Sequence, residues 1–446
     1  MGKVARDKTM QEIRDQLIGI RNAVGKEPIG IVYGFHIDGN ESDPEAAVTY
    51  LKDAIGKTPA GMNYTTGKFS YGGWADAFFM PRPCMLKYDG TVDYYLDPND
   101  YSKKEDGETA SDVADTTYGG NAMMEWGQNG KKIWYKIVPD AGDDTSASVY
   151  IADYQVDEGF HAWSFINNQG VYVDHFYTPC YFGTIVNDGT NDVLRSLSGQ
   201  SGANRCKNKT ATVEVQMARR NNTEADIWDI EVYADSILIN LLLVLMGKNL
   251  NTQKVYGEGL HTSGSDTVNN SFTSGVHDAK GLFYGTNSGA AATYANAVKV
   301  FGMENYWGFM WRRMQGLVAN DRVTRHKLTR GMEDGSTVAD YVVSDTASAY
   351  AGYVQGGTVP TASGVYVGQM QFNENEFTPK TAGGTSMDAS HYYCDAFWSN
   401  TGCRFASRGG YSGSGSEVGA WYLGLYSAAS NAGWHVGAAP SCKPLA

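Results

Sequence analysis

The chain has 446 residues, 42% hydrophobic and 19% charged, a composition typical of a folded protein of about two or three domains. Its formal net charge of −13 argues against a nucleic-acid-binding protein, which needs a basic patch, and against adhesion to anionic membranes. The 53 glycines indicate many turns and loops.

The N-terminal segment is polar and lacks the apolar stretch of a secretory signal. Its apolar residues recur at steps of three and four, the heptad spacing of a coiled coil. They are Met10, Ile13, Leu17, Ile20 and Val24. We therefore predict an oligomerising helix over residues 1–27, in a trimer because Ile occupies both kinds of core position. The alternative is an amphipathic helix that lies on its own domain.

Residues 28–145 are predicted to form a small β-rich domain of mixed structure. Asp89 and Gly90 stand between β-forming residues, which is the signal of a hairpin. One helix is expected over residues 43–55, because a capping aspartate followed by proline opens it and Gly56 can end it.

The third segment, residues 146–446, alternates short strands with two predicted helices. The first, over 227–247, is apolar almost all round towards its end, which predicts a buried helix that stops at Gly247. Its apolar run is too short to span a bilayer. The second is predicted from four apolar residues at helical spacing, which we expect to pack in the core. They are Trp307, Trp311, Met314 and Val318.

Motifs of enzymes and metal sites are absent from the sequence. No HExxH, GxGxxG, GxxxxGK[ST] or GxSxG motif occurs. The six cysteines form no CxxC pair, so we expect buried free thiols and no metal. Cys394 and Cys403, nine residues apart, stay open as a redox or metal pair, as does a glycosidase-type carboxylate pair among the many acidic residues. We therefore predict a protein without cofactor or catalytic residue.

The segment 405–442 is rich in small and aromatic residues, with eight Gly, seven Ser, three Tyr and two Trp. Apolar residues interleave regularly with them, which argues against a flexible linker and predicts strands over 418–426 and 434–437. Tyr, Trp, Ser and Gly are also the residues of antibody paratopes. We expect about half of the aromatic side chains to point outward and to bind a ligand.

This segment resembles the variable region of proteins that retroelements diversify in gut bacteriophages. The matching scaffold residues are Arg408-Gly409-Gly410, Gly419-Ala420, Tyr422-Leu423, Leu425, Ala428, Ser430-Asn431, Trp434 and Gly437-Ala438. Where the family usually carries Asn, the sequence has residues that an Asn codon reaches when its adenines are replaced. These are Gly424, Tyr426, Ser427, Gly433 and His435. Upstream stretches such as FGMENYWGFMWRR and HYYCDAFW are similar to the same tail proteins.

The resemblance implies an α+β fold class. In it, the coiled-coil helix and a tail-attachment domain over 28–145 precede a C-type lectin-like domain, of the type of formylglycine-generating enzymes, over 146–446. It also implies a homotrimer at the tip of a phage tail, made in the host cytoplasm. Its variable region would bind a host bacterial surface receptor, glycan or protein, while the N-terminus binds other tail proteins. Neither nucleic acid nor membrane insertion is expected.

The ligand-binding residues predicted on this basis carry aromatic, hydroxyl or imidazole groups. They are Tyr411, Ser412, Ser414, Ser416, Trp421, Tyr426, Ser427, Trp434 and His435. The low charge of the segment favours a neutral ligand. Two alternatives remain: a structural tail or baseplate protein without a variable site, and a tail-associated enzyme, either a depolymerase or a formylglycine-type oxidase.

Overall fold

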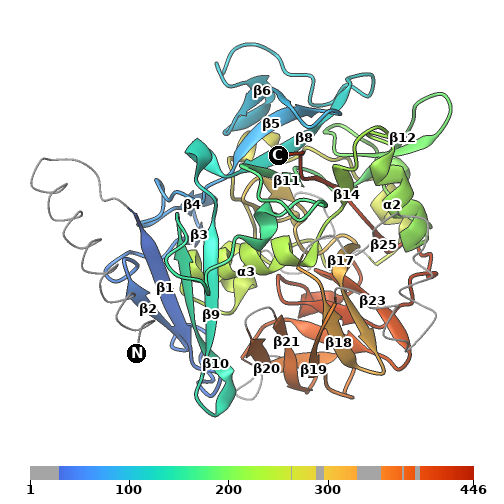
Figure 1. Cartoon of the computed structure of the whole chain (residues 1–446). Helices are drawn as coiled ribbons and strands as arrows, with labels where there is room; N and C mark the ends of the chain where they lie inside the picture. The colour runs from blue at the N-terminus through green and yellow to red at the C-terminus, as the bar shows by residue number, and fades with distance from the viewer. Residues whose placement is uncertain (1–29, 263, 288–295, 329–352, 374–375, 387–391) are drawn as a thin grey trace, which may run out of the picture.

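The computed structural model describes residues 30–262, 264–287, 296–328, 353–373, 376–386 and 392–446 (Figure 1). The described part of the chain is mostly β, with 38% of its residues in strands and 13% in helices. The predicted α+β class with a C-terminal C-type lectin-like domain is therefore wrong. The predicted oligomerising helix, residues 1–27, lies outside the described residues.

A four-stranded antiparallel sheet occupies the left of Figure 1, in the order β2-β1-β10-β9. Its strands are β1 (Val32–Ile37), β2 (Val48–Lys52), β9 (Trp134–Asp140) and β10 (Asp143–Ala152). Beside it lies the hairpin of β3 (Gly61–Asn63) and β4 (Lys68–Ser70). The helix predicted over 43–55 is wrong, because Val48–Lys52 pairs with β1 instead. Pairing with a neighbouring strand outweighs a short helical pattern of only three apolar residues.

The upper sheet of Figure 1 has seven strands in the order β14-β26-β11-β8-β5-β6-β7. They are β5 (Arg82–Lys87), β6 (Val92–Asp97), β7 (Asp100–Lys104), β8 (Gly120–Trp126), β11 (Phe176–Pro179), β14 (Trp228–Ile230) and β26 (Pro440–Cys442). The predicted hairpin is confirmed, since β5 and β6 pair antiparallel and Gly90 has φ +83° at the turn. The domain boundary predicted near 146 falls inside β10, and this sheet takes strands from both sides of it.

The longest described helix, α3 (Tyr233–Gly247), crosses the middle of the molecule between the sheets (Figure 1). All fifteen of its residues are buried, and it ends at Gly247, so the predicted burial and the predicted end of this helix are confirmed. The predicted start at residue 227 is wrong, because Trp228–Ile230 forms β14 instead. The other described helices are short: α2 (Ala211–Arg219), α4 (Thr252–Tyr256) and α5 (Asp266–Asn270). None of the described helices is long and apolar enough to cross a membrane.

A nine-stranded sheet at the lower right of Figure 1 almost closes into a barrel. Its strands are β17 (Trp311–Asn320), β18 (Val323–His326), β19 (Val354–Thr358), β20 (Val365–Asn373), β21 (Glu376–Gly383), β22 (Ala396–Ser399), β23 (Cys403–Arg408), β24 (Leu423–Leu425) and β25 (Val436–Gly437). Its outermost strands meet where the backbone N–H of Gly357 donates to the Glu376 carboxylate at 2.9 Å. Two small pairs complete the strands: β12 (Thr184–Asn187) with β13 (Asp192–Arg195), and β15 (Lys299–Val300) with β16 (Met303–Glu304).

The helix predicted around Trp307 and Trp311 is wrong, because Trp311–Asn320 forms β17 at the centre of this sheet. Nine of the ten residues of β17 are buried. A strand that is buried on both faces lacks the period-two alternation of a half-buried strand. Its apolar residues can therefore fall at helical spacing by chance. The strands predicted over 418–426 and 434–437 are present but shorter, as β24 and β25.

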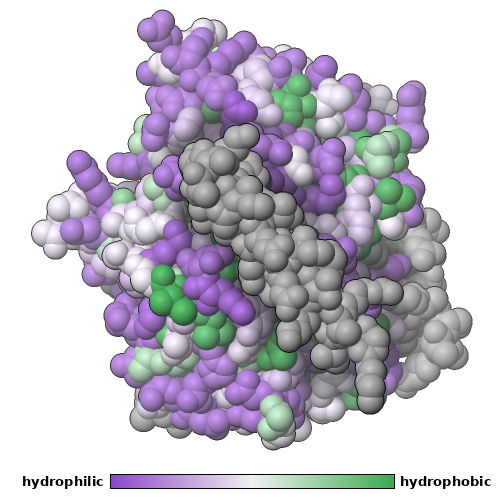
Figure 2. Space-filling view, turned by 60° about the vertical axis from the view of Figure 1, so that its left-hand side comes forward, coloured by the Kyte–Doolittle hydropathy of each residue, from purple (hydrophilic) through white to green (hydrophobic). Residues whose placement is uncertain are grey.

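The surface on the side of the four-stranded sheet is mostly hydrophilic, with small separate hydrophobic patches (Figure 2). All six cysteines are free; Cys403 is half-buried and the other five are buried. The prediction of buried free thiols is therefore confirmed for five of them.

Candidate ligand-binding pocket

A hollow of about 460 Å³ lies on the nine-stranded sheet, and we call it the aromatic pocket. Small-molecule sites commonly enclose roughly 300–1,000 Å³. Five aromatic side chains line it: Trp311, Trp398, Tyr411, Tyr422 and Tyr426. Its other lining residues are Ser407, Gly413, Ser414, Glu417, Gly424, Ser427, His435 and Val436. Most of these residues come from the C-terminal segment that the sequence singles out.

Strand register brings the floor of the pocket together. Gly424 on β24 pairs with Trp398 on the parallel strand β22 and with Ser407 on the antiparallel strand β23. Directly paired residues point to the same face of a sheet, so all three positions face the pocket. Trp311 joins them because its backbone N–H donates to the His435 carbonyl oxygen at 2.9 Å, beside the short pairing of β17 with β25.

One wall of the pocket is a chain of hydrogen bonds that ends on a carboxylate. Nε1 of Trp398 donates to the Tyr422 hydroxyl oxygen at 2.6 Å, and that hydroxyl donates to Oε2 of Glu417 at 2.9 Å. Burial raises the pKa of Glu417 above its ordinary value, although the hydrogen bond from Tyr422 opposes the shift. Burial, and then the Glu417 charge, raise the pKa of Tyr422, so the phenol keeps its proton.

Tyr411 and His435 of the lining pack with Trp434 in a cluster of three aromatic rings. The ring centroids of Tyr411 and His435 are 5.3 Å apart, and those of Tyr411 and Trp434 are 5.7 Å apart. Trp434 and His435 meet edge to face at 5.5 Å. Burial, and then the nearby charge of Arg313, lower the pKa of His435. The imidazole is therefore neutral at pH 7 and adds no positive charge to the pocket.

Behind the pocket, a buried salt-bridge triad anchors the strand that leads into it. The Glu231 carboxylate binds Arg408 at 2.5 Å and Arg312 at 3.1 Å. Nη1 of Arg408 also donates to the Tyr306 carbonyl oxygen at 2.7 Å. Removing one partner of a buried, hydrogen-bonded ion pair is strongly destabilising, because the other charge stays buried without it. The triad therefore holds β23 in place.

Two glycines of the same segment sit where no side chain fits. Gly410 has φ +75°, and a Cβ on it would lie 2.5 Å from the Tyr422 ring. A Cβ on Gly437 would lie 1.9 Å from the backbone carbonyl oxygen of Cys206. Both glycines and Arg408 therefore serve the fold, whereas Gly424, Tyr426, Ser427 and His435 line the pocket.

Five of the nine predicted ligand-binding residues line the aromatic pocket. They are Tyr411, Ser414, Tyr426, Ser427 and His435. Trp434 is half-buried and flanks the pocket through its contact with Tyr411. Ser416 is exposed outside the pocket, and its hydroxyl forms a 3.2 Å hydrogen bond with the Tyr366 hydroxyl.

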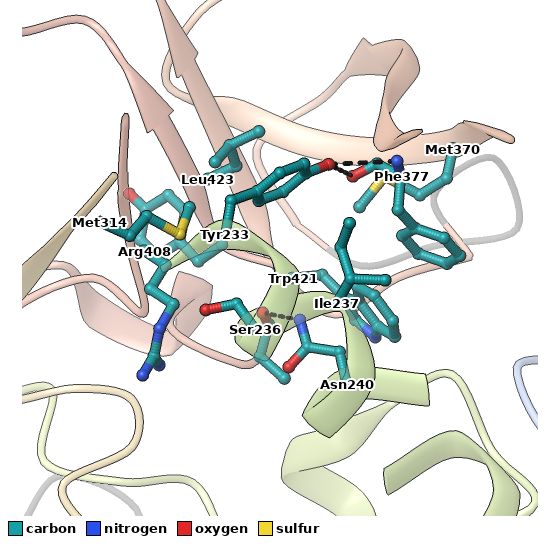
Figure 3. A pocket seen from close by; sticks show the side chains of 12 residues that line it. Tyr233, Ser236, Ile237, Asn240, Met314, Met370, Phe377, Arg408, Trp421 and Leu423 are labelled. Atoms are coloured by element: carbon teal, nitrogen blue, oxygen red, sulfur yellow. Dashed lines mark hydrogen bonds between the residues drawn. The ribbon is translucent and has the colours of Figure 1, made fainter. Parts of the chain in front are cut away.

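The remaining two predicted residues, Ser412 and Trp421, are buried and do not reach the pocket. The Ser412 hydroxyl donates to Oδ1 of Asn269 at 2.9 Å. The Trp421 indole stacks on Phe377 with ring centroids 4.5 Å apart, and Figure 3 shows it next to α3 in the core. The strand predicted over 418–426 begins only at Leu423, so Trp421 lies in the turn before β24 and packs into the core.

Eight lining residues were not among the predicted ligand-binding residues. They are Trp311, Trp398, Ser407, Gly413, Glu417, Tyr422, Gly424 and Val436. Trp398 is 36% exposed at the end of the stretch HYYCDAFW, which the resemblance already includes, and its exposure depends on strands β22 and β24 pairing across the sheet. Glu417 is, with Arg408, one of only two charged residues in 405–442, and this isolation is the signal that could have identified it.

No known protein-family model matches the sequence, and no curated protein is significantly similar to it. Within the described part of the chain, no group of three or more His, Cys, Asp or Glu side chains is placed to hold a metal ion.

Proposed function

We propose that this protein is a phage tail receptor-binding protein that holds a host-surface ligand in the aromatic pocket. One observation carries the proposal. Four of the five positions at which the resemblance expects variation line the pocket, namely Gly424, Tyr426, Ser427 and His435; the fifth, Gly433, does not. Of the matched positions, Arg408 and Gly437 are buried away from the pocket, whereas Tyr422 is part of its lining. Such a division lets the binding surface change at little cost in stability.

The pocket residues suit adaptable recognition. Tyr and Trp offer large, rigid contact areas with few rotatable bonds, and Ser and Gly offer space and hydrogen bonds. Tyr426 is 48% exposed and Trp398 36% exposed, and exposed aromatic side chains at a hollow are typical of interaction sites. These properties support binding of a partner.

A binding role fits the pocket better than glycan cleavage. Glycosidases need two carboxyl groups, about 5–10 Å apart, on either side of the scissile bond. Glu417 is the one carboxylate among the residues that line the aromatic pocket. We therefore include in the proposal that the protein binds its receptor without turning it over.

The proposal extends to the assembly. A homotrimer at the tail tip, attached to other tail proteins through its N-terminal region, would present three pockets to one cell surface. Linked sites rebind before they diffuse away, so weak single-site affinity becomes useful avidity.

The test combines three substitutions in the pocket, Tyr411→Ala, Tyr426→Ala and His435→Ala. We expect adsorption of the protein to host cells to fall at least about tenfold, because contact residues at the centre of an interface dominate its affinity. The matched control is Tyr172→Ala, which removes a 40% exposed tyrosine outside the pocket. Unchanged adsorption by a folded triple variant would sink the proposal.

A further inference from the structure

We propose that the aromatic pocket binds a positively charged alkylammonium group of the host receptor, held over the aromatic rings and against Glu417. This inference rests on the proposed function and deepens it by naming the chemistry of the ligand. It differs from the expectation of a neutral ligand, which treats the low charge of the segment 405–442 as uniform.

The charge of the pocket is the first argument. Glu417 is the one lining residue with a full charge, and the lining holds neither lysine nor arginine. No ion pair joins Glu417 to a basic side chain among the residues that the structure describes. A half-buried carboxylate without a cation is an electrostatic deficit that a positively charged ligand would fill.

The direction of the hydrogen bonds is the second argument. The indole N–H of Trp398 is committed to Tyr422, and the hydroxyl proton of Tyr422 is committed to Glu417. Two strong donors of the pocket therefore point along the wall instead of towards a ligand. Oε1 of Glu417 remains as an acceptor. An anionic ligand would meet the negative charge of Glu417, whereas an ammonium group would meet an acceptor.

The arrangement of the rings is the third argument. The Trp311 and Tyr422 rings are inclined at 56° with centroids 4.5 Å apart, and the Trp398 and Tyr426 rings are inclined at 83° with centroids 5.7 Å apart. Inclined rings present π faces from more than one side, and π faces attract alkylammonium groups. A carboxylate beside such rings adds direct charge attraction.

A neutral saccharide is the competing ligand, since sugars also stack on aromatic rings. The two ligands differ in their need for charge on Glu417. Removal of that charge weakens the binding of a cation and leaves stacking of a neutral ring unaffected. The choice between them therefore depends on one carboxylate.

The experiment measures binding to the full-length protein by tryptophan fluorescence, because Trp311 and Trp398 line the pocket. The probes are choline and its neutral isostere 3,3-dimethylbutan-1-ol, together with butylammonium and butan-1-ol. We expect at least one cation to bind saturably and about tenfold more tightly than its neutral counterpart. The inference is overturned if neither cation binds, or if each cation binds no more tightly than its neutral counterpart.

Variants sharpen the result. Glu417→Gln keeps an acceptor for Tyr422 and removes the charge, so we expect about tenfold weaker binding of the cation and no change for the neutral probe. Glu224→Gln, an exposed carboxylate outside the pocket, is the matched control. Tyr426→Phe keeps the ring and should retain binding. If Glu417→Gln binds the cations as well as the unmodified protein does, the inference fails.

Host-cell adsorption separates this inference from the proposed function. If the triple variant loses adsorption while Glu417→Gln adsorbs normally and choline does not compete, the pocket binds a receptor that is not cationic. The proposed function then stands and the inference falls. If the triple variant and the unmodified protein adsorb equally, both fall. Loss of adsorption in Glu417→Gln and competition by choline support both.

Discussion

Two sets of residues lie within the segment 405–442 and differ in their surroundings. Arg408 forms a buried salt bridge, and Gly410 and Gly437 lie where the surrounding atoms leave no room for a side chain. Tyr426 and His435 line a hollow on the surface. The difference shows that neighbouring residues of this segment serve either the stability of the fold or the lining of the pocket. Substitutions in the first set should therefore lower the free energy of unfolding, and those in the second set should weaken ligand binding.

The largest effect is expected from Arg408→Ala. It leaves the buried Glu231 carboxylate with one of its two arginine partners, which costs about 3–5 kcal/mol of the free energy of unfolding. Denaturant unfolding measures it. The control is Arg404→Ala, on the same strand, where the side chain is half-buried and donates to the Thr401 carbonyl oxygen. Equal losses of unfolding free energy in the two variants would show that the salt bridge of Arg408 contributes no more than an ordinary half-buried arginine.

A smaller effect is expected from Gly437→Ala. The added methyl group would collide with the Cys206 carbonyl oxygen, and the backbone must shift at a cost of about 1–3 kcal/mol. The matched change is Gly433→Ala, whose methyl group would meet the His435 ring, a side chain that can turn. We expect thermal unfolding to separate the two variants by at least a few degrees. A reversed order would contradict the comparison.

Tyr426→Ala should do the opposite of these variants. Because the side chain is 48% exposed, we expect the free energy of unfolding to change by no more than about 0.5 kcal/mol. Loss of its ring from the pocket should weaken choline binding about three- to tenfold. Paired unfolding and titration experiments check both numbers. A large loss of stability would show that the pocket residues also hold the fold.

The smallest effect concerns pH. The raised pKa of Glu417 means that its charge, and with it the affinity for a cation, is complete above this pKa and is lost as pH falls through it. His435 acts in the same direction, because it gains a positive charge below its lowered pKa. Titrations with choline from about pH 8 to about pH 4 should show weaker binding at low pH. In Glu417→Gln the remaining pH dependence should belong to His435, next to Arg313.

Local signals in the sequence predicted some elements correctly. The end of α3 at Gly247 and the hairpin at Asp89-Gly90 depend on residues within a few positions of one another. The strands β2 and β17 were mistaken for helices because their state depends on partners elsewhere in the chain. Non-local pairing leaves no periodic mark in so short a strand.

The same distinction holds for the site. Tyr411, Tyr426 and His435 lie in one segment of unusual composition, so the sequence was sufficient to single them out, and all three line the pocket. Trp311 and Trp398 belong to β17 and β22, which meet the segment only through pairing in the sheet. Their place at the pocket follows from the three-dimensional register and not from their spacing along the chain.

The strand β26 has a consequence for synthesis. It pairs with β11 and β14, which leave the ribosome long before it does, and it stands between them in the upper sheet. That sheet cannot be completed until residues 440–442 have been translated, after the whole pocket segment. A frameshift or premature stop between 405 and 439 would therefore remove β26 and leave β11 and β14 without their shared partner. The unpaired strand edges would promote aggregation and degradation. Only a reading frame that stays intact through this segment, where the resemblance expects variation, therefore gives a protein with a complete upper sheet.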